Sequence, residues 1–112
     1  MTWRIFGLSL LQPWASLMAD GCKLNETRSW RAPLKRGEYI VVHASKRMQP
    51  GDGAMAEAWG YDVVELPQGS ILSVHRFLEA RRSEECRPEG LERAYGDYSA
   101  GRWVWRTEFV HK

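Results

Sequence analysis

The chain has 112 residues, of which 44% are hydrophobic and 27% are charged, and its formal net charge is +2. This length suits a single domain spanning residues 1–112, and the composition is that of an ordinary soluble globular protein. No apolar run approaches the roughly 20 residues that cross a membrane, and the opening residues lack the apolar stretch of a signal peptide. We therefore expect a cytoplasmic protein with no membrane partner. The net charge is too small to predict a nucleic-acid partner by itself, because non-specific affinity depends on many phosphate contacts.

The cysteines and histidines form no pattern typical of a disulfide framework or a metal site. Two thiols, Cys22 and Cys86, in a chain without a secretory signal are expected to be free. The histidines lie far apart and match no zinc-binding spacing. They are His43, His75 and His111. We expect neither a metal nor a cofactor.

The first half of the chain begins with a predicted strand and helix. Residues 5–10 form the strand, and Pro13 suits the first position of the helix, where its missing N–H costs nothing. Gly21 ends the helix, because glycine accepts the left-handed conformation easily. Between these two points, apolar side chains recur at helical spacing and are expected to face the core. They are Trp14, Leu17 and Met18.

Two further strands follow this helix. Residues 25–30 form a short polar strand, and residues 38–44 form a third strand with an apolar run at 39–42. That run is apolar on both faces of the strand. A strand covered on both sides indicates a barrel or a helix-covered sheet.

The second half predicts a turn, a short helix and two strands. Residues 50–53 form the turn, and Asp52 caps a helix that ends near Trp59. Residues 63–66 are expected to be a short strand, and residues 70–80 a longer one. One face of the longer strand carries Leu72, Val74 and Leu78.

The C-terminal part predicts a charged loop at 81–90, a helical turn at 91–95, a loop at 96–101 and a last strand at 102–110. In that strand, aromatic residues alternate with other side chains. Several strands with few helices indicate a mainly β domain of the α+β class that is closed or nearly closed.

The six tryptophans are expected to have two kinds of role. Three stand on amphipathic patterns and are predicted to be core, because tryptophan supplies a large buried area. These are Trp14, Trp103 and Trp105. Trp30, near Arg28 and Arg31, and Trp59, at the end of a short helix, are the candidates for stacking on unpaired bases.

Four blocks of the sequence resemble the ASCH family. Residues 8–16 (LSLLQPWAS) resemble its opening strand and helix start, and residues 21–28 (GCKLNETR) fit its signature of Gly, Lys, Glu and Arg at spacings of two, three and two. Residues 43–46 (HASK) and residues 95–103 (YGDYSAGRW) are similar to two further blocks of the family. The blocks occur in the family's order, and the resemblance covers nearly the whole chain.

The resemblance implies a PUA-like pseudo-barrel of about five to six strands with two or three short helices. It also implies a cleft where the signature residues gather. Family members are regarded as RNA-binding, so the implied partner is single-stranded RNA, a nucleoside or a modified nucleotide. Relatives often continue beyond the point that corresponds to Lys112. An edge of the barrel left incomplete there favours homodimerisation.

A small branch of the family hydrolyses acylated cytidine, releasing the acyl group from the exocyclic nitrogen. That branch has a lysine at the position of Lys23 and often a threonine where this chain has Glu26. The branch also uses a glutamate before the last strand. Four residues fit that position equally well: Glu84, Glu85, Glu89 and Glu92.

Lys23, Glu26 and Arg28 therefore carry the most specific hypothesis. A protonated Lys23 binds phosphate or an oxyanion, whereas a catalytic base must lose its proton near neutral pH through burial or a nearby like charge. Arg28 either supplies that charge or pairs with Glu26. In a hydrolase, Lys23 would act as the base or stabilise the oxyanion, and Glu26 would orient water. In a purely structural interpretation, the three side chains are a salt-bridge network that ties the helix end to the second strand.

The remaining predicted site residues serve binding. Arginine and aromatic planes stack on bases, lysine meets phosphate, and hydroxyl groups hold substrate. The predicted binding residues are Arg28, Trp30, Ser45, Lys46, Tyr98, Ser99 and Arg102. An RNA- or nucleoside-binding domain is the leading hypothesis, an amidohydrolase is the alternative, and a protein-interaction module is a third class.

Overall fold

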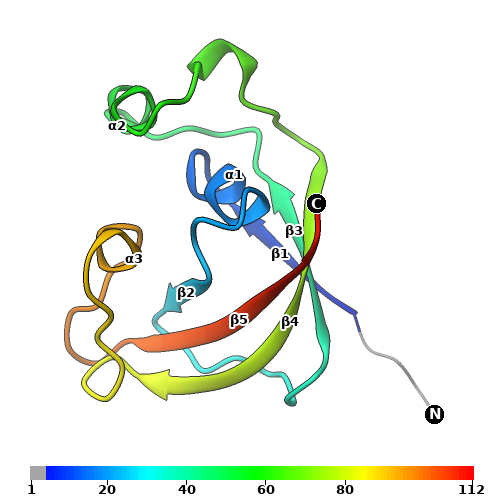
Figure 1. Ribbon diagram of the computed structural model, residues 1–112, viewed down its shortest axis with the longest axis vertical. Helices are drawn as coiled ribbons and strands as arrows, with labels where there is room; N and C mark the ends of the chain where they lie inside the picture. Colours follow the sequence, from blue (N-terminus) through cyan, green and yellow to red (C-terminus); the bar gives the residue numbers. More distant parts are fainter. Residues whose placement is uncertain (1–4) are drawn as a thin grey trace.

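A computed structural model describes residues 5–112 of the chain as one curled sheet with short helices (Figure 1). The five strands are β1 (Ile5–Leu10), β2 (Asn25–Arg28), β3 (Tyr39–Ala44), β4 (Ile71–Arg82) and β5 (Trp103–His111). Their order in the sheet is β1-β3-β4-β5-β2. β1 pairs with β3 in parallel, and the other three pairs are antiparallel. The expected mainly β, α+β fold is confirmed, in the form of a half-barrel consistent with a pseudo-barrel.

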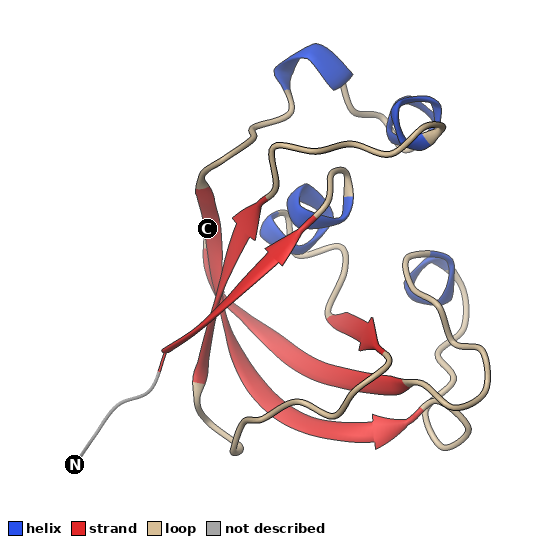
Figure 2. Ribbon diagram, turned by 180° about the vertical axis from the view of Figure 1, so that it is seen from behind, coloured by secondary structure: helices blue, strands red, loops and turns tan. Residues whose placement is uncertain are grey.

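The helices are short and connect the strands. They are α1 (Trp14–Ala19), α2 (Asp52–Ala58), α3 (Leu91–Ala94) and the 3-10 helix η1 (Val63–Glu65). α1 lies in the hollow of the curled sheet, and Figure 2 shows the same arrangement from behind. Among residues 5–112, no helix has the length and apolar character needed to cross a membrane.

The strand expected at 63–66 is wrong, because this segment forms η1. The carboxylate of Asp62 accepts a hydrogen bond from the Val64 amide at 3.1 Å. An aspartate side chain that binds the backbone two residues on favours a turn over a strand. This local contact therefore overrides the β propensity of the valine pair.

The helix-capping role expected for Asp52 is also wrong. Gly51 precedes α2 in a left-handed conformation with φ of 89°. Asp52 itself lies in the first turn, where its carboxylate accepts a hydrogen bond from the Gln49 amide at 3.1 Å. Its negative charge is still well placed, because the helix N-terminus carries partial positive charge.

Two strands, β4 and β2, differ from the expectation at their C-terminal ends. β4 continues through Arg82, where a loop was expected to begin at residue 81, because Arg81 pairs with Val104 and Arg82 with Trp103. β2 ends at Arg28, two residues earlier than expected. The partner strand therefore determines where each of these strands stops.

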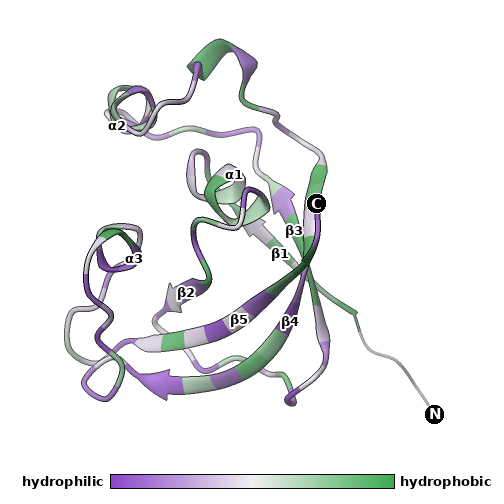
Figure 3. Cartoon of the chain, in the orientation of Figure 1, coloured by the Kyte–Doolittle hydropathy of each residue, from purple (hydrophilic) through white to green (hydrophobic). Residues whose placement is uncertain are grey.

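The core fills the concave side of the sheet beneath α1. Most of its buried side chains come from β1, β3, β4, β5 and α1, and among them are Leu8, Ile40, Val42, Phe77, Met18 and Trp105. Figure 3 shows the apolar colouring of α1 against the alternating colouring of β4 and β5. The predicted core role is confirmed for Trp105, which is fully buried, whereas Trp14 and Trp103 are half-buried.

The fully buried face of β4 is more polar than its sequence suggests. Leu72, Val74 and Leu78 do share one face, but that face is only half-buried. The buried face carries Ser73, His75 and Phe77. These residues stand on the core side because Ser73 pairs with Val42, and His75 with Ile40, in the register with β3.

Candidate functional site

A cleft of about 540 Å³ lies where the sheet fails to close, between the edge strands β1 and β2. Ser9 and Leu10 of β1 form one wall, and β2 with the segment after it forms the other. The residues just before β5 line a third side. Arg28 bridges the two edge strands, because its Nη2 donates to the Ser9 carbonyl at 3.3 Å. The missing backbone pairing between β1 and β2 is thus replaced by a cleft crossed by one arginine.

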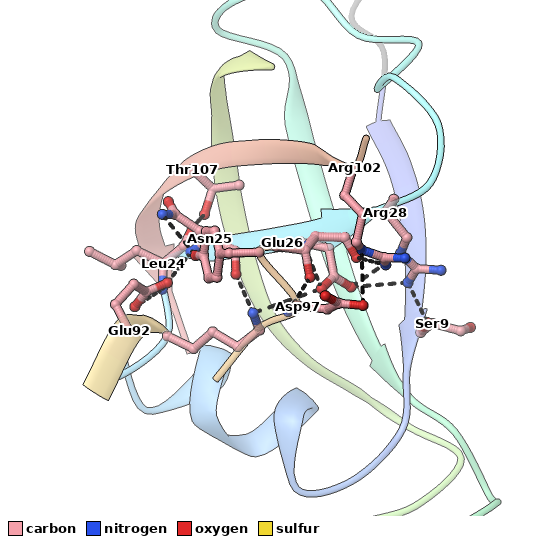
Figure 4. A network of polar contacts seen from close by, with 12 residues as sticks. Ser9, Leu24, Asn25, Glu26, Arg28, Glu92, Asp97, Arg102 and Thr107 are labelled. Carbon is pink, nitrogen blue, oxygen red and sulfur yellow. Dashed lines mark hydrogen bonds and ion pairs between the residues drawn. The ribbon is translucent and has the colours of Figure 1, made fainter. Parts of the chain in front are cut away.

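Glu26 and Arg28 form the charged wall of this cleft (Figure 4). Glu26 is only 7% exposed. Its Oε2 accepts hydrogen bonds from Arg28 Nη2 at 3.0 Å and Nε at 3.2 Å, and its Oε1 accepts one from the Thr27 amide at 2.9 Å. Charge-assisted bonds of this kind fix both side chains. Arg28 thus pairs with Glu26, and its positive charge also helps burial to lower the pKa of Lys23.

Lys23 is completely buried and lies behind Glu26. Its Nζ donates to the Asn25 carbonyl and lies 3.8 Å from Glu26 Oε1. Burial lowers the pKa of the Lys23 ammonium, while the carboxylates of Glu26 and Glu92 oppose that shift. Lys23 is not among the residues that line the cleft. It therefore contacts the site through Glu26.

Glu92 holds the segment that carries Lys23. Both of its carboxylate oxygens accept from the Leu24 amide at 3.1 Å, and Oε1 also accepts from the Asn25 amide at 2.7 Å. Among the four glutamates considered before the last strand, Glu92 thus lies beside Lys23, whereas Glu84 accepts from the Gly101 amide. The turn between α1 and β2 is positioned from α3, far away in the sequence.

The loop before β5 is attached to β2 through Thr27. The Asp97 amide donates to the Thr27 hydroxyl at 3.0 Å, and Arg102 Nη2 donates to the Thr27 carbonyl at 3.3 Å. Arg102 Nε lies 3.4 Å from Asp97 Oδ2. This attachment places Asp97 and Arg102 in the wall of the cleft, near Arg28. The three sequence blocks at residues 8–16, 21–28 and 95–103 therefore all contribute residues to the cleft.

The family model of the ASCH domain matches residues 8–109, nearly the whole chain. The chain belongs to the ASCH family. This family has in general a PUA-like, RNA-binding fold. The comparison with curated proteins gives no significant match.

The predicted binding residues of this ASCH domain divide into two groups by position. Arg28, Trp30 and Arg102 line the cleft. The hydroxyl of Tyr98 accepts from Asn25 at 3.3 Å, and Ser99 donates to Asp97 at 2.6 Å, so both hold the wall from outside the cleft. A binding role for Tyr98 and Ser99 stays a prediction.

Ser45 and Lys46 lie after β3 and do not line the cleft. The Ser45 amide donates to the Leu10 carbonyl at 2.8 Å, and its hydroxyl accepts from the Arg47 amide at 3.1 Å. The Lys46 side chain packs against Gly69. Ser45 therefore borders the β1 wall through backbone pairing, and a ligand contact for either residue stays a prediction.

The aromatic wall of the ASCH cleft combines an expected residue with unexpected ones. Trp30 lines the cleft, is 51% exposed, and has the Arg28 guanidinium carbon 5.3 Å from its ring centroid. Trp14 and Tyr95 also line the cleft. Trp59, expected as a stacking residue, packs edge-on against both, with centroid distances of 6.5 Å to Trp14 and 5.0 Å to Tyr95. Trp59 thus supports the aromatic wall from behind.

Sequence reasoning missed Trp14, Tyr95 and Asp97 as cleft residues. Trp14 was assigned to the core on its helical spacing. It is the first residue of a helix of only six residues, and it lines the cleft between β1 and β2. Tyr95 and Asp97 belong to the block at 95–103 that carried the family resemblance. That block was the available signal, and it did not reveal which of its residues face inward.

Among residues 5–112, no group of three or more histidine, cysteine, aspartate or glutamate side chains is placed to hold a metal ion. Both cysteines are free thiols.

Proposed function

We propose that the cleft binds single-stranded RNA or a nucleoside, with one unpaired base held between β1 and β2. The observation that carries this proposal is an exposed tryptophan, Trp30, beside Arg28 in a cleft of about 540 Å³. This volume lies within the range of small-ligand pockets, roughly 300–1,000 Å³. Unpaired bases bind proteins by stacking on aromatic and guanidinium planes.

The charged side chains suit the rest of a nucleotide. Arg28 and Arg102 both line the cleft, and each is held by a carboxylate, Glu26 and Asp97 respectively. A guanidinium held in this way presents its remaining N–H groups to a phosphate or to a base edge. We assign Glu26 and Asp97 to positioning these two arginines.

Lys23 acts on binding indirectly in this proposal. Its buried ammonium is held between the Asn25 carbonyl and Glu26, so it fixes the carboxylate that orients Arg28. Its position behind Glu26 favours this role over a direct contact with phosphate. Replacement of Lys23 is therefore expected to weaken binding through disorder of Glu26 and Arg28.

Titration with short oligoribonucleotides and nucleosides, followed by calorimetry or fluorescence anisotropy, tests the proposal. Trp30→Ala removes the stacking surface and is expected to cost about 1–3 kcal/mol of binding free energy, which is the usual value for one base. Phe109→Ala is the matched control, because Phe109 is a 40% exposed aromatic residue that does not line the cleft. Affinity of Trp30→Ala equal to that of the wild type would contradict the proposal.

An amidohydrolase acting on acylated cytidine is the second candidate. The observation that favours it is the buried Lys23 behind Glu26, outside the cleft lining, with the Glu26 and Glu92 carboxylates beside it. In this reaction, water attacks the acyl carbonyl carbon, the bond from carbon to the exocyclic nitrogen breaks, and a proton passes to the leaving amine. Lys23, with its pKa lowered by burial, is suited to carry that proton, with Glu26 orienting the water. The chain has no hydroxyl at position 26, where the hydrolytic branch often has threonine.

Two substitutions of Lys23 separate the candidates. A hydrolase is expected to lose turnover equally in Lys23→Ala and Lys23→Arg, because arginine does not give up its proton in a protein. Released acyl group is measured by mass spectrometry after incubation with acylated cytidine, free and in short RNA. Thermal unfolding of both variants controls for loss of the fold at this buried position. Absence of both binding and turnover in the folded wild type would favour the interaction-module hypothesis.

A further inference from the structure

A second cluster of arginine and tryptophan lies at the ends of β4 and β5. The Arg82 guanidinium carbon lies 4.8 Å from the ring centroid of Trp103, and the Arg31 guanidinium carbon lies 5.6 Å from the same centroid. Trp103 is half-buried, whereas both arginines are exposed. We name Arg31, Arg82 and Trp103 the arginine platform.

Strand register places the arginine platform next to the cleft. Trp103 pairs with Arg82 on one neighbouring strand and with Arg28 on the other. Directly opposed residues of antiparallel strands have side chains on the same face of the sheet. The row Arg82, Trp103 and Arg28 therefore crosses β4, β5 and β2 on one face, and its last member lines the cleft. Arg31 directly follows Trp30, the exposed tryptophan of the cleft.

The two platform arginines differ from the arginines in the cleft because, within residues 5–112, their guanidinium N–H groups have no hydrogen-bond acceptor. Within residues 5–112, neither Arg31 nor Arg82 donates a side-chain hydrogen bond or forms an ion pair with a carboxylate. The hydrogen bond from the Gly101 amide, at 2.6 Å, lowers the pKa of Glu84, with a smaller contribution from the positive charge of Arg82, so this carboxylate is bound to Gly101 and not to Arg82. Stacking on an indole fixes the plane of a guanidinium while leaving the N–H donors at its edge free.

We propose that the arginine platform binds the phosphodiester backbone of a single strand whose base occupies the cleft. The ligand is then a polynucleotide and not a free nucleoside, because a nucleoside has no flanking phosphates to reach Arg31 and Arg82. A planar guanidinium suits this partner, since it donates two parallel hydrogen bonds to phosphate oxygens. This inference rests on the proposed binding of a base in the cleft and extends it along the strand.

The test compares ligands of two lengths on three proteins. The ligands are the four ribonucleoside 5′-monophosphates and ribonucleotide octamers of each base. The proteins are the wild type, Arg31→Ala/Arg82→Ala, and the control Lys35→Ala/Arg47→Ala. The control removes the same charge from exposed residues outside the cleft and the platform.

We expect the wild type to bind its preferred octamer at low salt more tightly than the matching monophosphate, on the order of tenfold or more. The Arg31→Ala/Arg82→Ala variant is expected to lose most of that difference while its monophosphate affinity stays unchanged. Loss of two phosphate contacts also lowers the slope of log affinity against log salt by about 1.4 for a single strand. The Lys35→Ala/Arg47→Ala control is expected to keep the wild-type ratio of octamer affinity to monophosphate affinity.

The other outcomes separate this inference from the proposed function. Equal affinity for octamer and monophosphate in the wild type, or full octamer affinity in Arg31→Ala/Arg82→Ala, overturns the platform but leaves the cleft. Octamer binding that is lost in Arg31→Ala/Arg82→Ala but kept in Trp30→Ala, the variant that tests the proposed function, supports the platform and contradicts base binding in the cleft. Binding of neither ligand overturns both.

Discussion

The hollow of the sheet contains two regions with opposite chemistry. Beneath α1, residues such as Ile40 and Val42 are completely buried among other apolar side chains. At the seam between β1 and β2, the buried side chains are instead charged, and Lys23 and Glu26 are the deepest of them. Trp105 stands between the regions, packed against Phe6 on one side and Trp30 on the other.

The two regions are expected to contribute differently to the free energy of unfolding. Burial of apolar surface stabilises the fold beneath α1, at roughly 25 cal/mol per Å². A buried ion pair contributes little net stability, because its desolvation cost is comparable with its Coulomb energy. The charged seam is therefore poorly explained as a stabilising device. It fits the preorganised binding wall that we propose.

The largest effect is expected from breaking the buried pair in the seam. Glu26→Gln leaves the Lys23 ammonium buried without its nearest counter-charge, so we expect a loss of about 3–5 kcal/mol in unfolding free energy. Lys23→Met/Glu26→Gln removes both charges at similar volume and is expected to recover part of that loss. Urea denaturation of the two single variants and the double variant measures the coupling.

An exposed ion pair provides the control for this measurement. Arg76 and Glu108 lie 3.0 Å apart, with side chains 41% and 46% exposed. Glu108→Gln is therefore expected to cost less than about 1 kcal/mol. Strict additivity of the two seam substitutions would show that Lys23 and Glu26 are not energetically coupled, and the contrast between the regions would lose its basis.

A second prediction concerns a polar intrusion into the apolar region. His75 is completely buried opposite Ile40, its Nε2 lies 2.8 Å from the Ser73 hydroxyl, and its Nδ1 has no partner within residues 5–112. Burial lowers the pKa of His75 to about 4. Since an unfolded histidine titrates near 6.5, the unfolded chain binds more protons between these values. Stability should therefore fall as pH drops from about 6.5 to about 4, by at most about 3 kcal/mol.

The variant Ser73→Ala/His75→Leu isolates this effect, because it removes the titrating group and leaves no buried hydroxyl unpaired. Unfolding free energies of wild type and variant at pH 7 and pH 4 are compared by denaturant titration. The decrease in unfolding free energy from pH 7 to pH 4 should be smaller in the variant than in the wild type. An identical fall in both proteins would mean that His75 is neither the titrating group nor a weak point of the apolar region.

The sequence predicted the elements well where local pattern determines structure. The strand at Ile5–Leu10 lies where it was expected, and the end of the first helix near Gly21 followed from glycine chemistry. The meeting of Glu26 and Arg28 was one of two options, and their spacing on one strand placed them on the same face. Family resemblance, and not periodicity, indicated where the cleft would be.

The parts that could not be predicted depend on contacts between distant residues. Asp97 reaches the cleft because its amide binds Thr27, seventy positions earlier in the chain. The polar buried face of β4 depends on its register with β3, which places Ser73 opposite Val42. Neither the Asp97–Thr27 contact nor the β3–β4 register can be predicted from a local sequence pattern. A shift of the register by one residue would exchange the two faces of a strand.

The smallest effect is expected at Gly96, where the loop before β5 packs on β2. A Cβ atom added there would lie 3.0 Å from Tyr98 Cε2 and 3.2 Å from Thr27 Cγ2, and both of these residues are buried. Gly96→Ala should therefore push the loop away from Thr27, at a cost of about 1 kcal/mol in unfolding free energy. Because Asp97 is next in the chain, we also expect oligonucleotide affinity to fall.

Gly53→Ala is the matched control for this substitution. Gly53 lies within α2, and an added Cβ would meet only Val63 at 3.9 Å, an ordinary contact. Because alanine is the better helix former, this change should stabilise the protein by up to about 1 kcal/mol and leave affinity unchanged. If Gly96→Ala lowers the unfolding free energy and Gly53→Ala raises it, and only Gly96→Ala loses oligonucleotide affinity, the Thr27 contact holds the cleft wall in place. Unchanged stability and affinity in Gly96→Ala would instead mean that the wall is held by Arg102 alone.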